Sequence, residues 1–445
     1  MFNHRHTGTL VCLLAILFAF TAVPAFAQYG GPSILSRGGN SPGRRGNAPV
    51  NFTGHVGTTY RYETGLLFPI IADGERVFGT SDSGYSLNAG VYGGHDWKND
   101  SVGVDYRGDY RRQVSRSQFN GSNHAISIDY SHRQGRRWIF FVRETGGTTN
   151  RAFGGFASPA FPSNDTGQGI PLAELFDIRT NFAQSSAYAT YEKSGRTSFT
   201  FGGQGFFVRR ENLSLINTQG YSLRASVSHR LDRSNTLSLE YQYLRYEFPR
   251  LQASTNTQGV LVRFKRRLTQ SISADVGGGF YQLDSIGTAT VTVSPEVAAI
   301  LGRPTTRATF NRSSILPNVD ARLTYGQERG AANFTVTSGV SPGNGVFITS
   351  NRTTVSGGYS YTGIRRAAVG LNAGYTRSGS VALDLGALQA YQASAGLSYR
   401  LYSNLSFTSN FDYRSFSGTA TSGRSGTGIS LGVTWSTSYS PLAIW

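Results

Sequence analysis

Alternation of apolar and polar residues is the dominant pattern of this chain, and residues 221–231 show it clearly. Every odd position there except His229 is apolar, and every even position is serine or arginine. Successive side chains of a β-strand point to opposite faces, so the pattern predicts a strand with one apolar and one polar face. Because it recurs along the chain, it predicts an all-β protein, either a sandwich with a dry centre or a barrel whose apolar face meets lipid.

Eighteen segments follow this alternation. They are 52–63, 84–94, 101–112, 123–133, 137–145, 182–193, 196–208, 220–231, 236–247, 258–268, 270–283, 315–326, 331–341, 351–362, 365–376, 388–401, 404–415 and 427–439. The first is the weakest, and we include it because single-chain bacterial barrels have an even number of strands and both chain ends in the periplasm. Sixteen strands are the alternative count.

The gaps between these segments alternate in length without a break. Gaps such as 133–136 and 232–235 are short, whereas 146–181 and 284–314 are long. Short periplasmic turns and long extracellular loops are typical of an antiparallel up-and-down barrel in the outer membrane. By length alone, loop 146–181 is expected to fold into the lumen, and loop 284–314, with a candidate helical turn at 295–301, competes for that role.

The polar faces carry full charges, which bears on the choice between sandwich and barrel. In segment 258–268 the apolar Val260 and Val262 alternate with the basic Arg263 and Lys265. Burying unpaired ions in a dry core costs several kcal/mol each. A sandwich that points them to solvent satisfies the alternation equally well, but the gap lengths and the N-terminus favour a barrel with a wet interior.

The first 27 residues have the three regions of a secretory signal peptide. A basic start at His4 and Arg5 precedes an apolar run at 10–20, and Ala25-Phe26-Ala27 fits a cleavage site. The run is shorter than the roughly 20 residues that span a bilayer as a helix.

The rest of the chain divides into two parts. Residues 28–50 are rich in Gly, Pro, Ser and Arg and are predicted to form a disordered periplasmic segment, followed by the barrel at 51–445. The only cysteine, Cys12, lies in the predicted signal peptide, so the mature chain has none and thiol chemistry is excluded.

Over residues 52–445 the chain resembles the porin-like class of bacterial outer-membrane β-barrels, and no closer family is identified. The resemblance implies an outer-membrane location, lipid around the barrel, and recognition by the barrel assembly machinery through the C-terminal strand. Trp445 resembles the terminal aromatic residue of that signal, although Pro441 departs from the usual final strand. The predicted aromatic belts comprise Trp138, Tyr243, Tyr375, Tyr413, Trp435 and Trp445.

Residues able to do chemistry are scarce. His124 and His132 are the only histidines that share a strand face, and their spacing does not suit a metal site. Two Gly-x-Ser-x-Gly strings, at 39–43 and 339–343, have proline after the serine and lack the strand-to-helix elbow of a nucleophile. We expect no enzyme activity and no cofactor. The net charge of +17 is spread over strands, which argues against nucleic-acid binding.

Charged residues on the polar faces form the predicted pore lining. They are Arg107, Arg111, Arg224, Arg230, Arg263, Lys265, Arg267, Asp275, Arg322, Arg352, Arg366 and Arg414. Two interpretations stay open. Most of these charges pair within the wall, as Arg263 and Asp275 would across a hairpin, or Arg263, Lys265 and Arg267 form an anion-favouring ladder.

The predicted function is passive diffusion of small polar solutes through a porin-like channel, and an anion preference follows only if the second interpretation of the lining holds. The alternatives are a non-transporting structural or adhesion barrel that acts through its extracellular loops and, third, an outer-membrane barrel hydrolase. The sequence predicts neither the solute nor the oligomeric state.

Overall fold

The computed structural model describes most of the chain after residue 50. The described ranges are 51–64, 69–72, 75–78, 81–114, 120–149, 179–211, 215–292, 305–342, 348–381, 386–418 and 421–437. The predicted signal peptide, the 28–50 segment and Trp445 lie outside them. Within these ranges no helix is long and apolar enough to cross a membrane.

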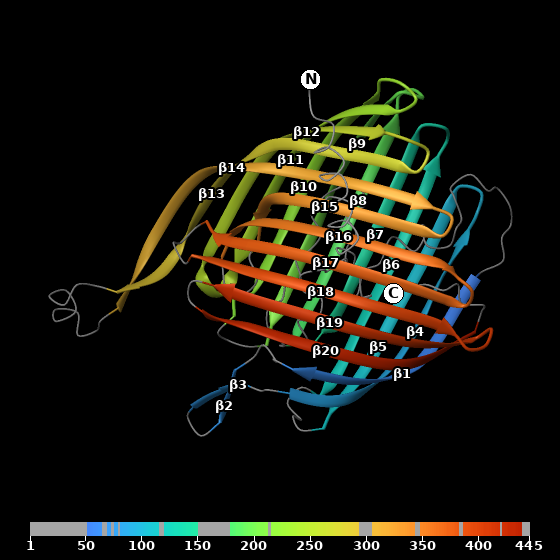
Figure 1. The fold of residues 1–445 in the computed structure, drawn as a ribbon. Coiled ribbons are helices and arrows are strands. Elements are labelled where there is room, and N and C mark those ends of the chain that lie inside the picture. Colours follow the sequence, from blue (N-terminus) through green and yellow to red (C-terminus); the bar gives the residue numbers. More distant parts are fainter. Residues whose placement is uncertain are drawn as a thin grey trace, which may run out of the picture.

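Eighteen strands form one closed antiparallel sheet (Figure 1). Their bounds are β1 Asn51–Thr64, β4 Ser81–Asp96, β5 Asp100–Gln113, β6 Gly121–Gln134, β7 Trp138–Thr149, β8 Thr180–Glu192, β9 Thr197–Arg210, β10 Thr218–Arg230, β11 Asn235–Phe248, β12 Ala253–Arg267, β13 Ile272–Thr292, β14 Thr305–Gln327, β15 Gly330–Ser341, β16 Ser350–Ile364, β17 Ala367–Ser380, β18 Ala387–Arg400, β19 Leu405–Gly418 and β20 Thr421–Ser436. Each strand pairs with the next, and β1 pairs with both β4 and β20, which closes the barrel.

The strand count confirms the predicted even number and excludes sixteen. The weak first segment is the strand that closes the barrel, since Tyr60 lies opposite Tyr85 on one side and Leu431 on the other. A closed sheet has no unpaired edge. The need for an even number, more than the strength of its own alternation, identified this strand.

The predicted loop 284–314 is largely wrong. β13 continues to Thr292 and β14 begins at Thr305, and their ladder extends as far as the pair Thr292 and Thr305, so this hairpin projects well beyond the other strands (Figure 1). Threonine and valine are frequent here, and both favour strands. The amphipathic alternation that marks a membrane segment is weak in this stretch, so the sequence pattern does not identify the stretch as strand. The candidate helical turn at 295–301 lies outside the described residues.

Other predicted long gaps are shorter than expected. The 248–257 gap contains only a 3₁₀ turn, Pro249–Leu251, and Gln252, and the 63–83 gap contains a small hairpin of β2 Pro69–Ala72 and β3 Glu75–Phe78. β20 already begins at Thr421. The strict alternation of gap lengths is therefore wrong in detail, although one end of the barrel carries only connections of two to four residues.

Backbone hydrogen bonds join the short connections to one another. The carbonyl of Arg196 accepts from the N–H of Arg230 at 2.7 Å, and the carbonyl of Ser234 accepts from the N–H of Arg267 at 2.8 Å. Comparable bonds link the other short turns around that end of the barrel. This end is consequently a continuous hydrogen-bonded ring.

Candidate functional site

The outer face of the barrel is apolar through its middle. In β10 the side chains of Tyr221, Leu223 and Val227 are exposed, whereas Ser222 between them is buried. Leu87 on β4 and Leu239 on β11 are likewise exposed, at 62% and 54%. A closed sheet turns its other face inward, so exposed apolar side chains in such numbers lie outside, where they require lipid. The fold and this belt define a bacterial outer-membrane β-barrel, with its short turns on the periplasmic side.

Aromatic residues of the predicted belts lie near both ends of the strands. At the short-turn end, Trp138 begins β7 and Trp435 is next to last in β20, and both rings are exposed. Tyr243, Tyr375 and Tyr413 lie on β11, β17 and β19, nearer the long-loop end. These heights fit two headgroup belts, and their contact with lipid stays a prediction.

The alternation reverses above Tyr243 in β11. Leu244 and Phe248 are buried, at 1% and 0% exposure, on the face that carries Glu240 lower down. The outward side chains above Tyr243 are Arg245 and Glu247, which form a 3.0 Å ion pair. The strand therefore leaves the lipid near Tyr243. The change of apolar parity in the sequence marks this boundary, although sequence reasoning had not used it.

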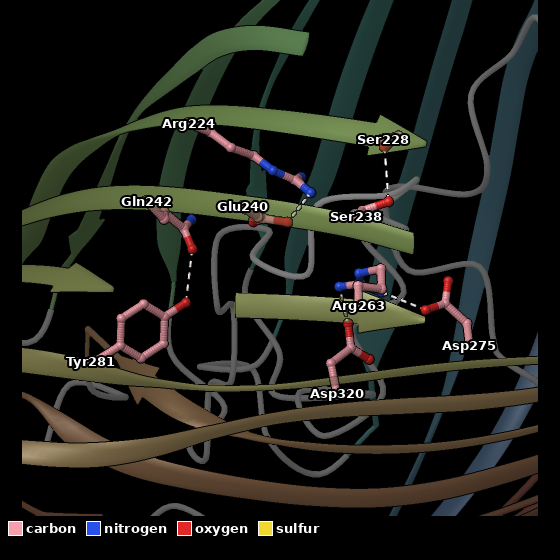
Figure 2. A network of polar contacts seen from close by, with 9 residues as sticks. All are labelled: Arg224, Ser228, Ser238, Glu240, Gln242, Arg263, Asp275, Tyr281 and Asp320. Atoms are coloured by element: carbon pink, nitrogen blue, oxygen red, sulfur yellow. Dashed lines mark hydrogen bonds and ion pairs between the residues drawn. The ribbon is translucent and has the colours of Figure 1, made fainter. Parts of the chain in front are cut away.

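Arg263 on β12 is held by two carboxylates of the inner wall. Its Nη1 donates to Asp275 on β13 at 3.2 Å and its Nη2 donates to Asp320 on β14 at 2.7 Å (Figure 2). The three side chains are largely buried. The predicted pairing with Asp275 is confirmed, but direct register places Gly277 opposite Arg263 and Lys265 opposite Asp275. Both contacts favour the interpretation that Arg263 is paired within the wall, over the interpretation that it belongs to an anion-favouring ladder.

Other arginines of the inner wall are paired in the same way. Arg224 pairs with Glu240 (Figure 2), Arg107 with Asp105 at 2.8 Å, and Arg61 with both Glu63 and Asp412. Arg111 lies 3.9 Å from Asp109. Arg143 also pairs with an acid, Asp129, at 2.6 Å. It was not predicted as a lining residue because residues 138–142 before it are all apolar and show no alternation. The interpretation of a paired wall accounts for these residues.

The remaining predicted lining residues lie in several places. Arg230, Lys265 and Arg267 are exposed near the periplasmic end, and none forms an ion pair with another described residue. Arg322 on β14 lies opposite Asp275 on β13. Arg414 on β19 lies opposite Gln392 on β18, and Arg352 on β16 lies opposite Gly339 on β15. Arg366 lies in the two-residue turn 365–366 at φ 63°, just outside β17.

An apolar cluster covers the inner wall near the long-loop end. It is formed by Leu244, Tyr246, Phe248, Ala253, Tyr281, Leu283, Val340, Ile348 and Val381. The Tyr281 hydroxyl donates to Gln242 at 2.8 Å (Figure 2). This cluster was absent from the sequence prediction, which treated the inner face as polar along its whole height.

The β15–β16 connection is anchored to this wall. The Thr349 hydroxyl lies 2.8 Å from that of Thr255 on β12, which lies 2.7 Å from that of Ser285 on β13. All three residues are fully or almost fully buried. The described part of this connection therefore leans across the inner wall, a role that sequence reasoning gave to loop 146–181, whose residues 150–178 lie outside the described chain.

Two features of the described residues bear on metal binding and on the serine strings. Three or more His, Cys, Asp or Glu side chains that could share a metal ion are not found there. The string at 339–343 begins at the end of β15, and Ser341 is the last strand residue, with no helix after it among the described residues. Residues 277–279 lie within β13 as ordinary strand.

Among known proteins, only solved structures match this chain, and they match it in fold at low sequence identity. No protein-family model matches the chain, and no curated protein matches it. Among solved structures, the outer membrane protein OpdK from Pseudomonas aeruginosa has 10% identity and a TM-score of 0.42, with 87% of this chain and 99% of that chain covered. The outer membrane channel DcaP of Acinetobacter baumannii has 13% identity and a TM-score of 0.39, with 87% and 96% covered.

A BenF-like porin from Pseudomonas fluorescens has 8% identity and a TM-score of 0.43, with 88% of this chain and 100% of that chain covered. The ferric-catecholate import receptor Fiu of Escherichia coli has the same identity and TM-score.

Proposed function

We propose that this protein is a porin-like channel for passive diffusion of small polar solutes across the outer membrane. The observation that carries the proposal is the charged, ion-paired inner wall of a closed 18-stranded barrel. Barrels of 16 to 18 strands leave room for an aqueous channel. Charged side chains in such numbers are stable inside only where water reaches them, because ions carried into a dry interior lose several kcal/mol of hydration each.

An anion preference is part of the proposal, and we assign its source to residues other than Arg263. Arg263 is neutralised by Asp275 and Asp320, whereas Lys265 and Arg267 are exposed near the periplasmic end. Rings of charged side chains set which ions pass through a pore. The positive charge that favours anions is therefore assigned to Lys265 and Arg267.

A non-transporting barrel is the second candidate, and one observation favours it. The apolar cluster around Leu283 lies on the inner wall near the long-loop end, and Thr349 of the β15–β16 connection is anchored to that wall. A barrel filled at that height would act through its loops or as part of the envelope. A barrel hydrolase has no comparable support among the described residues.

Conductance in planar lipid bilayers tests the proposal. Purified, folded protein should produce discrete current steps at concentrations where a heat-unfolded sample produces none. Heat-dependent mobility on a gel confirms beforehand that the sample is folded. A folded preparation that inserts into the bilayer and carries no current contradicts the channel and supports the second candidate.

A further inference from the structure

The periplasmic end of the barrel carries an excess of basic residues. We call this the basic rim and define it as the eight short connections with two strand residues on each side: 95–101, 133–139, 191–198, 229–236, 266–273, 326–331, 363–368 and 399–406. The rim contains fourteen Lys and Arg residues against five Asp and Glu. This excess of nine is more than half of the chain's net charge of +17. The charge is concentrated at one end and not spread evenly over the strands.

Three of the five rim acids are engaged in local contacts. Asp100 accepts from Tyr130 at 2.6 Å and lies 2.8 Å from His132. Asp232 accepts from the backbone N–H groups of its own turn. Glu192 pairs with Arg133 at 2.9 Å. Among the described residues, Arg136, Lys193 and Arg196 of the rim form no ion pair with these acids, so they can bind a partner outside the chain.

Exposed apolar side chains alternate with these cations. Six of the eight connections contain an exposed apolar or aromatic residue one or two positions from a lysine or arginine: Trp97, Trp138, Leu231, Leu268, Ile364 and Tyr402. Apolar rings and chains beside cations are suited to the boundary where lipid tails meet charged headgroups. A soluble anion would use the cations and have no need for the apolar residues.

Two adjacent turns, 135–137 and 193–196, form the densest part of the rim. The Glu192 N–H donates to the Arg137 carbonyl at 2.7 Å, which holds the two turns together. Arg137 donates to the Tyr191 hydroxyl at 3.2 Å, and the Tyr191 ring packs 4.9 Å from Trp138. Arg136, Lys193 and Arg196 are exposed on these turns. Arg136, Lys193 and Arg196 together offer several hydrogen-bond donors for one phosphate, next to the packed rings of Trp138 and Tyr191.

We propose that the basic rim binds anionic phospholipid headgroups of the periplasmic leaflet, with its tightest site at these two turns. The phosphodiester accepts from guanidinium and ammonium groups, and the first methylenes of the lipid chains rest on Trp138. Because the turns are joined by backbone hydrogen bonds, the backbone positions that carry the cations are fixed relative to one another before the lipid arrives. This binding is independent of whether the lumen conducts.

The test uses the full-length barrel extracted from vesicles of four parts phosphatidylcholine to one part phosphatidylglycerol, with native mass spectrometry of the retained lipid. The variant is R136Q/K193Q/R196Q. A basic residue near an anionic surface strengthens binding about fivefold. The wild-type barrel should therefore retain phosphatidylglycerol preferentially, and the variant should lose at least tenfold of that preference. High salt should weaken the wild-type preference.

The matched control removes three exposed arginines near the long-loop end, as R112Q/R209Q/R377Q, and should leave the lipid preference unchanged. Equal retention of both lipids by the wild-type barrel overturns the proposal. An equal loss in the control variant also overturns it, because net charge alone would then explain the effect. Displacement of the retained lipid by millimolar glycerol phosphate would identify a site for soluble anions and not for lipid. The single variant W138A, which keeps every charge, should weaken retention of both lipids at the site.

Discussion

Arg263 on β12 and Asp320 on β14 form a 2.7 Å ion pair although β13 lies between their strands. Gly277 is the β13 residue in direct register with both. A Cβ at Gly277 would meet only the side chain of Leu261, at 3.4 Å or more, so the Arg263 guanidinium passes over a β13 position with no side chain of its own. The pair shows how the inner wall neutralises its own charge across three strands.

Removing Asp320 should release Arg263 toward the lumen. In Asp320→Asn the guanidinium keeps only Asp275, so we expect a higher anion-to-cation permeability ratio and a loss of about 2 kcal/mol of unfolding free energy, as for other charged hydrogen bonds. Reversal potentials in a salt gradient and urea unfolding measure the two effects. Asp284→Asn, on the neighbouring strand β13 and outside this network, is the control; equal effects in both variants would contradict a specific role for Asp320.

Reversing the charge of Lys265 and Arg267 should lower the anion-to-cation permeability ratio severalfold. These side chains are exposed near the periplasmic end and have no ion-pair partner among the described residues. The double variant K265E/R267E is compared with Arg263→Gln, which removes a charge already balanced by two carboxylates and should change the ratio less. An unchanged ratio in the double variant refutes the assignment of selectivity to this pair.

Gly259 should be intolerant of any side chain. A Cβ at this position would meet the ring of Tyr281, whose hydroxyl bonds Gln242. Gly259→Ala is therefore expected to displace that ring and to reduce the unfolding free energy by about 1–3 kcal/mol. Gly278→Ala is a matched control, since no atom lies within 4 Å of a Cβ there. Urea midpoints measure both, and a neutral Gly259→Ala would show that Tyr281 moves without cost.

Thr349→Val should free the β15–β16 connection from the inner wall. The substitution preserves shape and removes the hydroxyl that bonds Thr255 at 2.8 Å. If this connection narrows the lumen, single-channel conductance should rise and its fluctuations increase. Thr353→Val, which removes a 3.0 Å bond to Ser338 between β15 and β16, controls for the loss of a strand-to-strand hydroxyl contact. The same conductance in both variants and in the wild type would place the constriction elsewhere.

The turn at 231–234 should lose support in acid. The hydrogen bond from the Asn235 side chain, with backbone N–H donors of the turn, lowers the pKa of Asp232. A carboxyl whose pKa is lower in the folded state contributes stability above its ordinary pKa, and this contribution is lost as the pH falls through the lower, folded value. The acid side of the unfolding profile should therefore be shallower in Asp232→Asn, measured by heat-dependent gel mobility. An identical profile would mean that Asp232 does not titrate with folding.

Much of the fold was predictable because strand alternation and strand count are local or topological properties. Segment 221–231 has the same parity in the sequence as in β10, since a strand alternates its side chains whatever surrounds it. β1 was predictable only through the requirement for an even number. The β13–β14 extension was missed because, beyond the lipid, neither face of a strand has to be apolar, so alternation no longer identifies it.

The inner wall was only partly predictable. Parity assigned Arg263 to it, but the contact with Asp320 joins two strands that are not neighbours, and only their register with β13 between them brings the two side chains together. The apolar cluster was not predicted, because the face that is polar in the lower part of β11 was assumed to be polar along the whole strand. Above Tyr243 that inner face becomes apolar.

By itself, the sequence determined that this chain is built of strands with one apolar and one charged face, because the period of two is a property of the extended backbone; the gap lengths and the N-terminus favoured a barrel over a sandwich. Only the tertiary structure decided which charges neutralise one another and that the periplasmic turns join into a basic ring. Those contacts join residues far apart in the chain, and their distances depend on closure of the sheet.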